Sequence, residues 1–262
     1  MLKNIMVHLD SASSCSERIQ LAGKLAQQHG ARLTGLYVFS SPRLTEPDRQ
    51  LAEARELFAE QTRDSGIATE FLQADTGFLH TGITEMVGYY ASFADLLVVS
   101  QPLQADRNKK YEVITSPERL LLGTGKPVLV LPQHGSAQKI GERIMVAWKA
   151  GPKASRATHD AMPLLRLAKH VNMVSIGDAM FARDESSRLA DYLTLHDVKA
   201  HVESIPQGAL GVGDTLLNLA ADDQIDMMVL GVHIANRRGR LDMGEVGAYL
   251  LRQMTVPMLL SH

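Results

Sequence analysis

Short apolar runs alternate with longer amphipathic segments from one end of the chain to the other. The first run, Ile5–Leu9, has the length of a strand buried on both faces. The segment Glu17–Gln28 has apolar side chains at helical spacing, and Gly30 after it is typical of a helix end. Three serines stand where a helix cap is expected, at Ser13, Ser14 and Ser16.

The same alternation continues through the first half of the chain. It predicts helices and strands in turn, namely strands at Arg32–Phe39, Thr69–Gln73, Leu96–Val99 and Val128–Leu131 and helices at Gln50–Arg63 and Thr81–Phe93. Because each connection is long enough for a crossover, we expect a five-stranded parallel sheet covered by helices on both faces.

The second half repeats this order of elements. Its expected strands are Ile144–Ala147, Val171–Ile176, His201–Ser204, Met227–Leu230 and Pro257–Leu260, and its expected helices are Ser155–Ala168, Glu185–Leu195, Asp214–Ala221 and Val246–Gln253. The polar stretch 133–141 has no apolar periodicity and is interpreted as a linker. The pattern therefore predicts two doubly wound α/β domains, residues 1–132 and 142–262.

The two halves also match in sequence. The residues ADLLVVS from Ala94 recur 131 positions later as IDMMVLG from Ile225. The residues IMV from Ile5 recur 139 positions later, from Ile144. We interpret this as the duplication of a whole domain, and halves of this length are each long enough to bury a core of their own.

Charge and composition narrow the classes of function. The net charge of −2 over 262 residues gives no long-range attraction for nucleic acid or for an anionic membrane. No polybasic arm, signal sequence or apolar run of membrane-spanning length is present, so we expect a cytoplasmic protein. The single cysteine, Cys15, excludes an internal disulfide and a cysteine-based metal cage. We expect no metal site.

Three stretches of the second half carry a resemblance to a known family: VAWKAGPKASRATHDAMPLL, IDMMVLG and LLRQMTVPMLLSH. They resemble the universal stress protein domain, and the duplicated chain resembles the tandem members of that family. The resemblance implies a Rossmann-like domain in each half and, in single-domain members, a dimer formed through the last strand. In a tandem chain the strands Val128–Leu131 and Met258–Leu260 would then meet as an internal pseudo-dimer, which would cover two exposed sheet edges.

The family binds ATP in a loop of the form Gly-x2-Gly-x9-Gly-(Ser/Thr), whose glycines let the backbone approach the phosphates at a helix start. The second half keeps Gly231 and Gly244 but has Ile234 at the second glycine. A β-branched residue at a positive φ costs about 1–3 kcal/mol, so we expect a loop of changed shape. The hydroxyl position holds Glu245, and a carboxylate facing a phosphate costs roughly 1–4 kcal/mol.

The first half departs further from the family pattern. It has Ser100, Leu103 and Val113 where the three glycines would be, which leaves no phosphate cradle. It keeps Asp10 at the end of its first strand, where the family places an acidic residue toward the adenosine. The second half has Lys149 at that position. Neither half therefore holds a complete set of binding residues.

Two features of the second half have alternative interpretations. The arginines of the altered loop are either phosphate clamps or a solvated basic loop paired with Asp242 and Glu245. Trp148 packs across the mouth of the crevice or stacks on a nucleobase. A nucleotide in this half would lie against Trp148, Lys149, Ile176, Leu230, Gly231, Arg237, Arg238, Gly244, Glu245 and Val246.

Three functions remain open at this stage. The leading one is a noncatalytic stress-response protein whose second domain binds an adenine nucleotide weakly or not at all. The second is a genuine ATP-binding protein that uses the arginine-rich loop and hydrolyses ATP slowly. The third is a scaffold with both crevices closed. The sequence holds no Ser-His-Asp arrangement and no P-loop lysine motif, so nothing in it favours catalysis.

Overall fold

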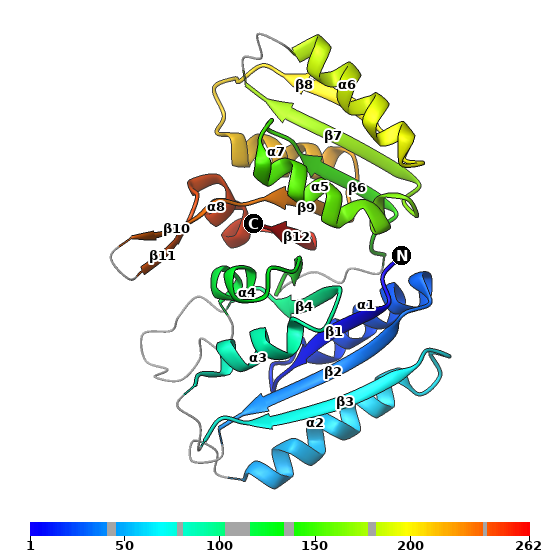
Figure 1. The fold of residues 1–262 in the computed structure, drawn as a ribbon, viewed down its shortest axis with the longest axis vertical. Coiled ribbons are helices and arrows are strands. Elements are labelled where there is room, and N and C mark those ends of the chain that lie inside the picture. Colours follow the sequence, from blue (N-terminus) through cyan, green and yellow to red (C-terminus); the bar gives the residue numbers. More distant parts are fainter. Residues whose placement is uncertain (41–45, 78–80, 103–115, 134–138, 178–181, 238–239) are drawn as a thin grey trace. The chain divides into compact units, whose positions relative to one another are not determined.

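The chain divides into two compact units, Met1–Ser136 and Ala137–His262. The computed structural model, drawn in Figure 1, describes residues 1–40, 46–77, 81–102, 116–133, 139–177, 182–237 and 240–262. Residues 134–138 of the predicted linker lie outside these ranges.

The first unit is built on a parallel sheet with the strand order β3-β2-β1-β4-β5. Its elements are β1 Asn4–Leu9, α1 Cys15–His29, β2 Arg32–Phe39, α2 Pro47–Thr62, β3 Thr69–Asp75, α3 Ile83–Ala91, β4 Leu96–Ser100, α4 Pro117–Thr124 and β5 Val128–Leu131. Helix α1 contacts α2, and α3 contacts α4. Right-handed crossovers place these two pairs on opposite faces of the sheet.

The second unit has the same architecture, with the strand order β12-β9-β6-β7-β8. Its elements are β6 Arg143–Ala147, α5 Pro152–Leu165, β7 His170–Ile176, α6 Ala182–Leu195, β8 His201–Ile205, α7 Val212–Asp222, β9 Met227–Gly231, β10 Ile234–Arg237, β11 Arg240–Met243, α8 Glu245–Gln253 and β12 Met258–Ser261. The prediction of two α/β domains with five-stranded parallel sheets is confirmed.

The central strands form the core of each unit. Residues 5–7 of β1 and residues 227–229 of β9 are all at most 2% exposed, so both faces of these strands are covered. Continuous apolar runs, without alternation of polar residues, are what a parallel sheet between two helix layers requires. Gly30 ends α1 with a left-handed backbone, φ 59°, and donates its N–H to the carbonyls of Ala26 and Gln27.

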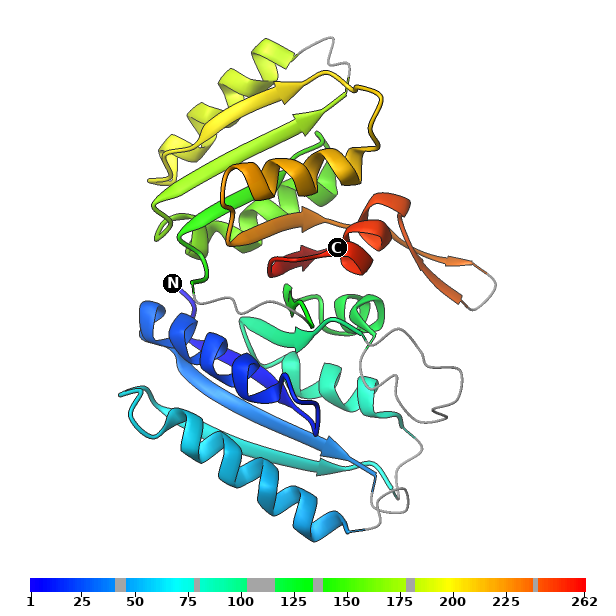
Figure 2. The ribbon, with the colours of Figure 1, turned by 180° about the vertical axis from the view of Figure 1, so that it is seen from behind.

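One element of the second unit was not expected from the sequence. The segment between β9 and α8 forms an antiparallel hairpin, β10–β11, and Figure 2 shows it extending away from the parallel sheet of its unit. Its register pairs Ile234 with Met243 at the base and Arg237 with Arg240 near the tip. The hairpin occupies the place where the resemblance implies a phosphate-binding loop.

Candidate functional site

Each unit has one point at which a doubly wound sheet binds ligands, the carboxyl edge where the strand order reverses. In the first unit this is the end of β1 beside β4, where Asp10 follows β1 and Ser100 ends β4. In the second unit it is the end of β6 beside β9, where Lys149 lies shortly after β6 and Gly231 ends β9. These two places are called the first crevice and the second crevice below.

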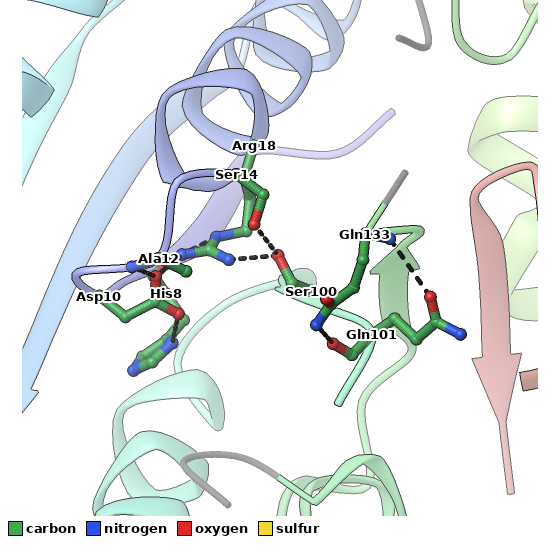
Figure 3. Close-up of polar contacts among 8 residues, drawn as sticks. All are labelled: His8, Asp10, Ala12, Ser14, Arg18, Ser100, Gln101 and Gln133. Atoms are coloured by element: carbon green, nitrogen blue, oxygen red, sulfur yellow. Dashed lines mark hydrogen bonds and ion pairs between the residues drawn. The ribbon is translucent and has the colours of Figure 1, made fainter. Parts of the chain in front are cut away.

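The side chain of Arg18, from α1, points toward the ends of β1 and β4 at the first crevice (Figure 3). It is only 1% exposed. Its Nε donates a hydrogen bond to the carbonyl oxygen of His8 at 2.8 Å, its Nη2 lies 2.8 Å from Oδ1 of Asp10, and its Nη1 donates to Oγ of Ser100. The guanidinium therefore joins the ends of β1 and β4. It pairs with the carboxylate of Asp10, which the resemblance assigns to adenosine binding.

Further contacts fix this arrangement. Oδ1 of Asp10 also accepts a hydrogen bond from the backbone N–H of Ala12 at 3.0 Å. Oγ of Ser14 lies 3.4 Å from Oγ of Ser100. Burial alone would raise the pKa of Asp10, but the Arg18 guanidinium, the nearby His8 and the hydrogen bonds to Asp10 hold that pKa below its ordinary value. Asp10 and Arg18 are thus a charged pair at neutral pH.

His8 and Cys15 complete the buried group beneath the first crevice. Burial lowers the pKa of His8 to about 4, although Oδ2 of Asp10 lies 3.7 Å from its Nδ1. Burial raises the pKa of the Cys15 thiol, so Cys15 is not an activated nucleophile. Removing one partner of a buried ion pair costs about 3–5 kcal/mol, so Arg18 and Asp10 hold each other in place. Leu103 and Val113 lie outside the described residues.

The second crevice is altered by its backbone. In the hairpin, the side chains of Ile234 and Met243 are 6% and 5% exposed, which places the base of the hairpin in the core. Ile234 belongs to a strand, and its φ is not positive. Ile234 therefore carries none of the backbone strain that a positive φ would impose on a β-branched residue.

Two backbone amides that flank the β10–β11 hairpin have carbonyl partners. The N–H of Gly244 donates to the carbonyl of His233 at 2.8 Å, and the N–H of Val232 donates to the carbonyl of Ser261 at 2.8 Å. A backbone N–H offers a single donor, so an amide paired in this way is not available to a phosphate. Val232 and Gly244 thus each have a backbone partner for their amide. The segment between them, residues 232–244, is called the altered turn below.

The two retained glycines have structural roles of different kinds. A Cβ added at Gly231 would lie 2.4 Å from the carbonyl carbon and oxygen of Lys153, so only glycine lets α5 approach β9 this closely. A Cβ at Gly244 would meet no atom nearer than 3.7 Å. Neither glycine has a positive φ. The need for glycine at Gly231 is thus explained by helix packing.

The start of α8 carries negative charge. Gly244 precedes the helix without a side-chain cap, Glu245 is the first helical residue, and both Glu245 and Val246 are exposed. A carboxylate in the first turn interacts favourably with the positive end of the helix dipole. Glu245 therefore takes the electrostatic position that a bound phosphate would occupy.

The remaining predicted site residues lie on separate parts of the second unit. The indole Nε1 of Trp148 donates to Oε1 of Glu185 at 2.6 Å, so Trp148 is directed toward α6. Lys149 is exposed, Ile176 is half-buried at the end of β7, and Leu230 is buried in β9. The backbone of Arg237 belongs to β10, and Arg238 lies outside the described residues.

Sequence reasoning missed Arg18, which is the central residue of the first crevice. A signal was present, because Arg18 stands three and seven positions before Leu21 and Leu25, on an apolar face of α1. It also missed a contact at the end of β12, where Nζ of Lys153 lies 3.2 Å from Nε2 of His262.

Comparison with known proteins rests on structure alone. No sequence family profile and no curated protein matches the chain. A universal stress protein from Archaeoglobus fulgidus DSM 4304 matches with a TM-score of 0.71 at 13% identity, over 98% of this chain and 97% of that chain. A chain from Pseudomonas aeruginosa UCBPP-PA14, assigned to the same proteins, matches with a TM-score of 0.60 at 16% identity, over 99% and 93% of the two chains.

The chain carries two universal stress protein folds. The full-length matches cover both units. Identities this low establish the fold of the chain, and the chemistry of its crevices must be argued from its own residues. Among the described residues, no helix is both long and apolar enough to cross a membrane.

Proposed function

We propose that this chain is a noncatalytic tandem universal stress protein whose crevices bind an adenine nucleotide weakly or not at all, and which acts through contacts with other molecules. The observation that carries the proposal is internal pairing at both crevices. Arg18 uses the carboxylate and the hydroxyl of the first crevice, and two turn amides of the second crevice have backbone partners.

The energetics support this proposal. A nucleotide in the first crevice would have to displace Arg18, which leaves a buried charge without its partner at a cost of about 3–5 kcal/mol. In the second crevice a phosphate would have to break backbone hydrogen bonds and approach Glu245, a carboxylate at the helix start. Costs of this size weaken nucleotide binding strongly, because about 1.4 kcal/mol changes a dissociation constant tenfold.

The hairpin itself favours one second candidate. Its ladder places Arg237 directly opposite Arg240 across β10 and β11, so two arginines stand at the same level of the hairpin. Guanidinium groups form strong charge-assisted hydrogen bonds with phosphates. A nucleotide bound by this hairpin, with slow hydrolysis, is the alternative function.

Isothermal titration calorimetry with ATP and Mg²⁺ separates the two candidates. We expect no binding heat at millimolar ATP in the wild-type protein. A dissociation constant below about 1 mM, equivalent to about −4 kcal/mol, that is lost in the double variant Arg237→Ala, Arg238→Ala would overturn the proposal and support the arginine site. Arg188→Ala is the matched control, because Arg188 is an exposed arginine of α6 whose Nε is paired with Asp184 at 2.8 Å.

A further inference from the structure

The second unit has a small pocket beneath α6, apart from the altered turn. Its lining includes Trp148, Ser175 and Glu185, with Ser204 on β8 beside Ser175. Figure 1 shows α6 running along the β7 and β8 side of the sheet. The interior has room for about one water-sized group, and its mouth opens to solvent.

The first unit provides an internal control, because the same region of its sheet is filled. In strand register, Gly35 and Phe71 of the first unit correspond to Met173 and Val202 of the second. A Cβ added at Gly35 would lie 2.7 Å from the ring of Phe58, a side chain of α2 that is 3% exposed. The ring centroids of Phe58 and Phe71 are 6.1 Å apart.

The next row of the two sheets shows the same contrast. Tyr37 and Gln73 of the first unit correspond to Ser175 and Ser204 of the second. Gln73 accepts a hydrogen bond from Nη2 of Arg55, from α2, at 2.9 Å. Two large side chains with packing partners have thus been replaced by two serines. The pocket is lined by these two serines and by Val202, all smaller than their counterparts, and by Met173, which is larger than Gly35.

The polar atoms of the pocket point to a specific ligand chemistry. Within the described part of the chain, Oε2 of Glu185 and the hydroxyls of Ser175 and Ser204 have no hydrogen-bond partner. Trp148 fixes Glu185 by donating to its other oxygen at 2.6 Å. A carboxylate and two hydroxyls that line one small pocket suit a primary ammonium group, which has three N–H donors and a positive charge. Such a group is also about the size of a water molecule.

We propose that this pocket binds the head group of a primary ammonium compound. Glu185 supplies the opposite charge, the two serines accept the remaining N–H donors, and Trp148 holds the Glu185 carboxylate in place through its indole N–H. The stem of the ligand leaves through the open mouth. The proposal is independent of nucleotide binding, since none of these acceptors belongs to the altered turn.

Trp148 makes the test direct, because it is the only tryptophan of the chain. Its fluorescence is titrated with propylammonium chloride at constant ionic strength, with 1-propanol as the neutral ligand of equal size. We expect a saturable change with propylammonium and at least tenfold weaker binding of propanol. No saturable change with propylammonium, or equal binding of both compounds, would overturn the proposal.

Two variants locate the site. Glu185→Gln keeps an acceptor for the indole but removes the charge, and we expect it to weaken propylammonium binding about tenfold or more. Asp184→Asn is its matched control, because Asp184 is exposed on the same helix and pairs with Arg188. Equal affinity in Glu185→Gln and wild type would contradict the proposal. Ser175→Tyr introduces the residue of the first unit and is expected to abolish binding; if it fails to fold, Glu185→Gln decides.

A further titration distinguishes the sources of such a head group. Nα-acetyl-lysine N-methylamide represents a lysine side chain of a partner protein, and propylammonium represents a free amine. Tighter binding of the lysine derivative supports the protein source, and equal binding supports a free amine. If neither compound gives a saturable change in Trp148 fluorescence, the proposal is wrong.

Discussion

The two crevices lie at the same place in the same fold, and their polar groups have different internal partners. In the first, a side chain from α1 spans the sheet edge, with the guanidinium of Arg18 on Asp10 and Ser100. In the second, the backbone itself is rebuilt, and the β10–β11 hairpin stands between β9 and α8. Polar groups at a sheet edge need hydrogen-bond partners. The first unit supplies them from a helix side chain, and the second supplies them from backbone carbonyls.

The sequence positions of the two crevices changed together. At the shift of 139 residues, Arg18 corresponds to Ala157 and Asp10 to Lys149. Ala157 is 1% exposed, so the second unit has a small buried residue where the first has the guanidinium. The buried cation and its carboxylate are both missing from the second unit, as expected if neither is tolerated without the other.

The largest effect is expected from breaking the pair of the first unit. Arg18→Met leaves Asp10 buried without its partner and should lower the free energy of unfolding by about 3–5 kcal/mol in urea. The double variant Arg18→Met, Asp10→Asn removes both charges and should recover much of this loss. Equal losses in the single and double variants would mean that Arg18 does not act through Asp10.

Acid should weaken the first unit through His8. Its pKa is about 4 when folded and about 6.5 when unfolded, so between these values the unfolded chain binds a proton that the folded chain does not. Stability is therefore fully present above pH 6.5 and falls as the pH decreases, by about 3 kcal/mol at pH 4.

Urea unfolding from pH 7 to pH 4 measures this loss in the wild type and in His8→Leu. The variant should keep only the slope of other groups, among them His29, whose pKa burial also lowers to about 4. The lowered pKa of Asp10 adds a loss of the same sign at lower pH. Identical pH slopes in both proteins would exclude His8 as the source.

In the second unit, Gly231→Ala should be destabilising, because the added Cβ would meet the backbone of Lys153 at 2.4 Å. Overpacking of this kind costs typically about 1–3 kcal/mol. Gly244→Ala is the matched control and should change stability by less than about 1 kcal/mol, since its Cβ has ordinary contacts. Thermal unfolding compares the two; equal effects would argue against a packing role specific to Gly231.

The smallest effect is expected at the start of α8. Glu245→Gln removes a favourable charge from the helix dipole and should cost about 0.3–1 kcal/mol at low salt. Glu60→Gln, in the last turn of α2, is the counterpart at a helix end and should be neutral or slightly stabilising. If both variants change the urea midpoint in the same direction, the dipole does not explain the role of Glu245.

The sequence predicts the parallel sheets because their strands are continuous apolar runs. Residues 32–39 were expected as a strand and form β2 with the same bounds, and Gly30 ends α1 as expected. Helix starts are less certain from sequence, since several residues can precede a first turn. Ser14 does precede α1, but it makes no side-chain cap hydrogen bond.

The role of Arg18 and the β10–β11 hairpin were harder to predict, for different reasons. Arg18 meets Ser100 across 82 positions, and no local pattern encodes that contact. The hairpin joins Ile234 to Met243, and its strands are too short for a periodicity to be visible. For Ile234 the sequence allows a local argument, because a positive φ is costly for a β-branched residue, and in the structure Ile234 lies in β10 without a positive φ.

Amide hydrogen exchange of Val232 and Gly244, resolved by NMR with and without MgATP, tests the central claim most directly. Both amides have backbone partners at 2.8 Å. The account predicts that millimolar MgATP leaves their exchange rates and chemical shifts unchanged. New protection at these amides and at the first turn of α8 in the presence of MgATP would show that the altered turn still binds a nucleotide.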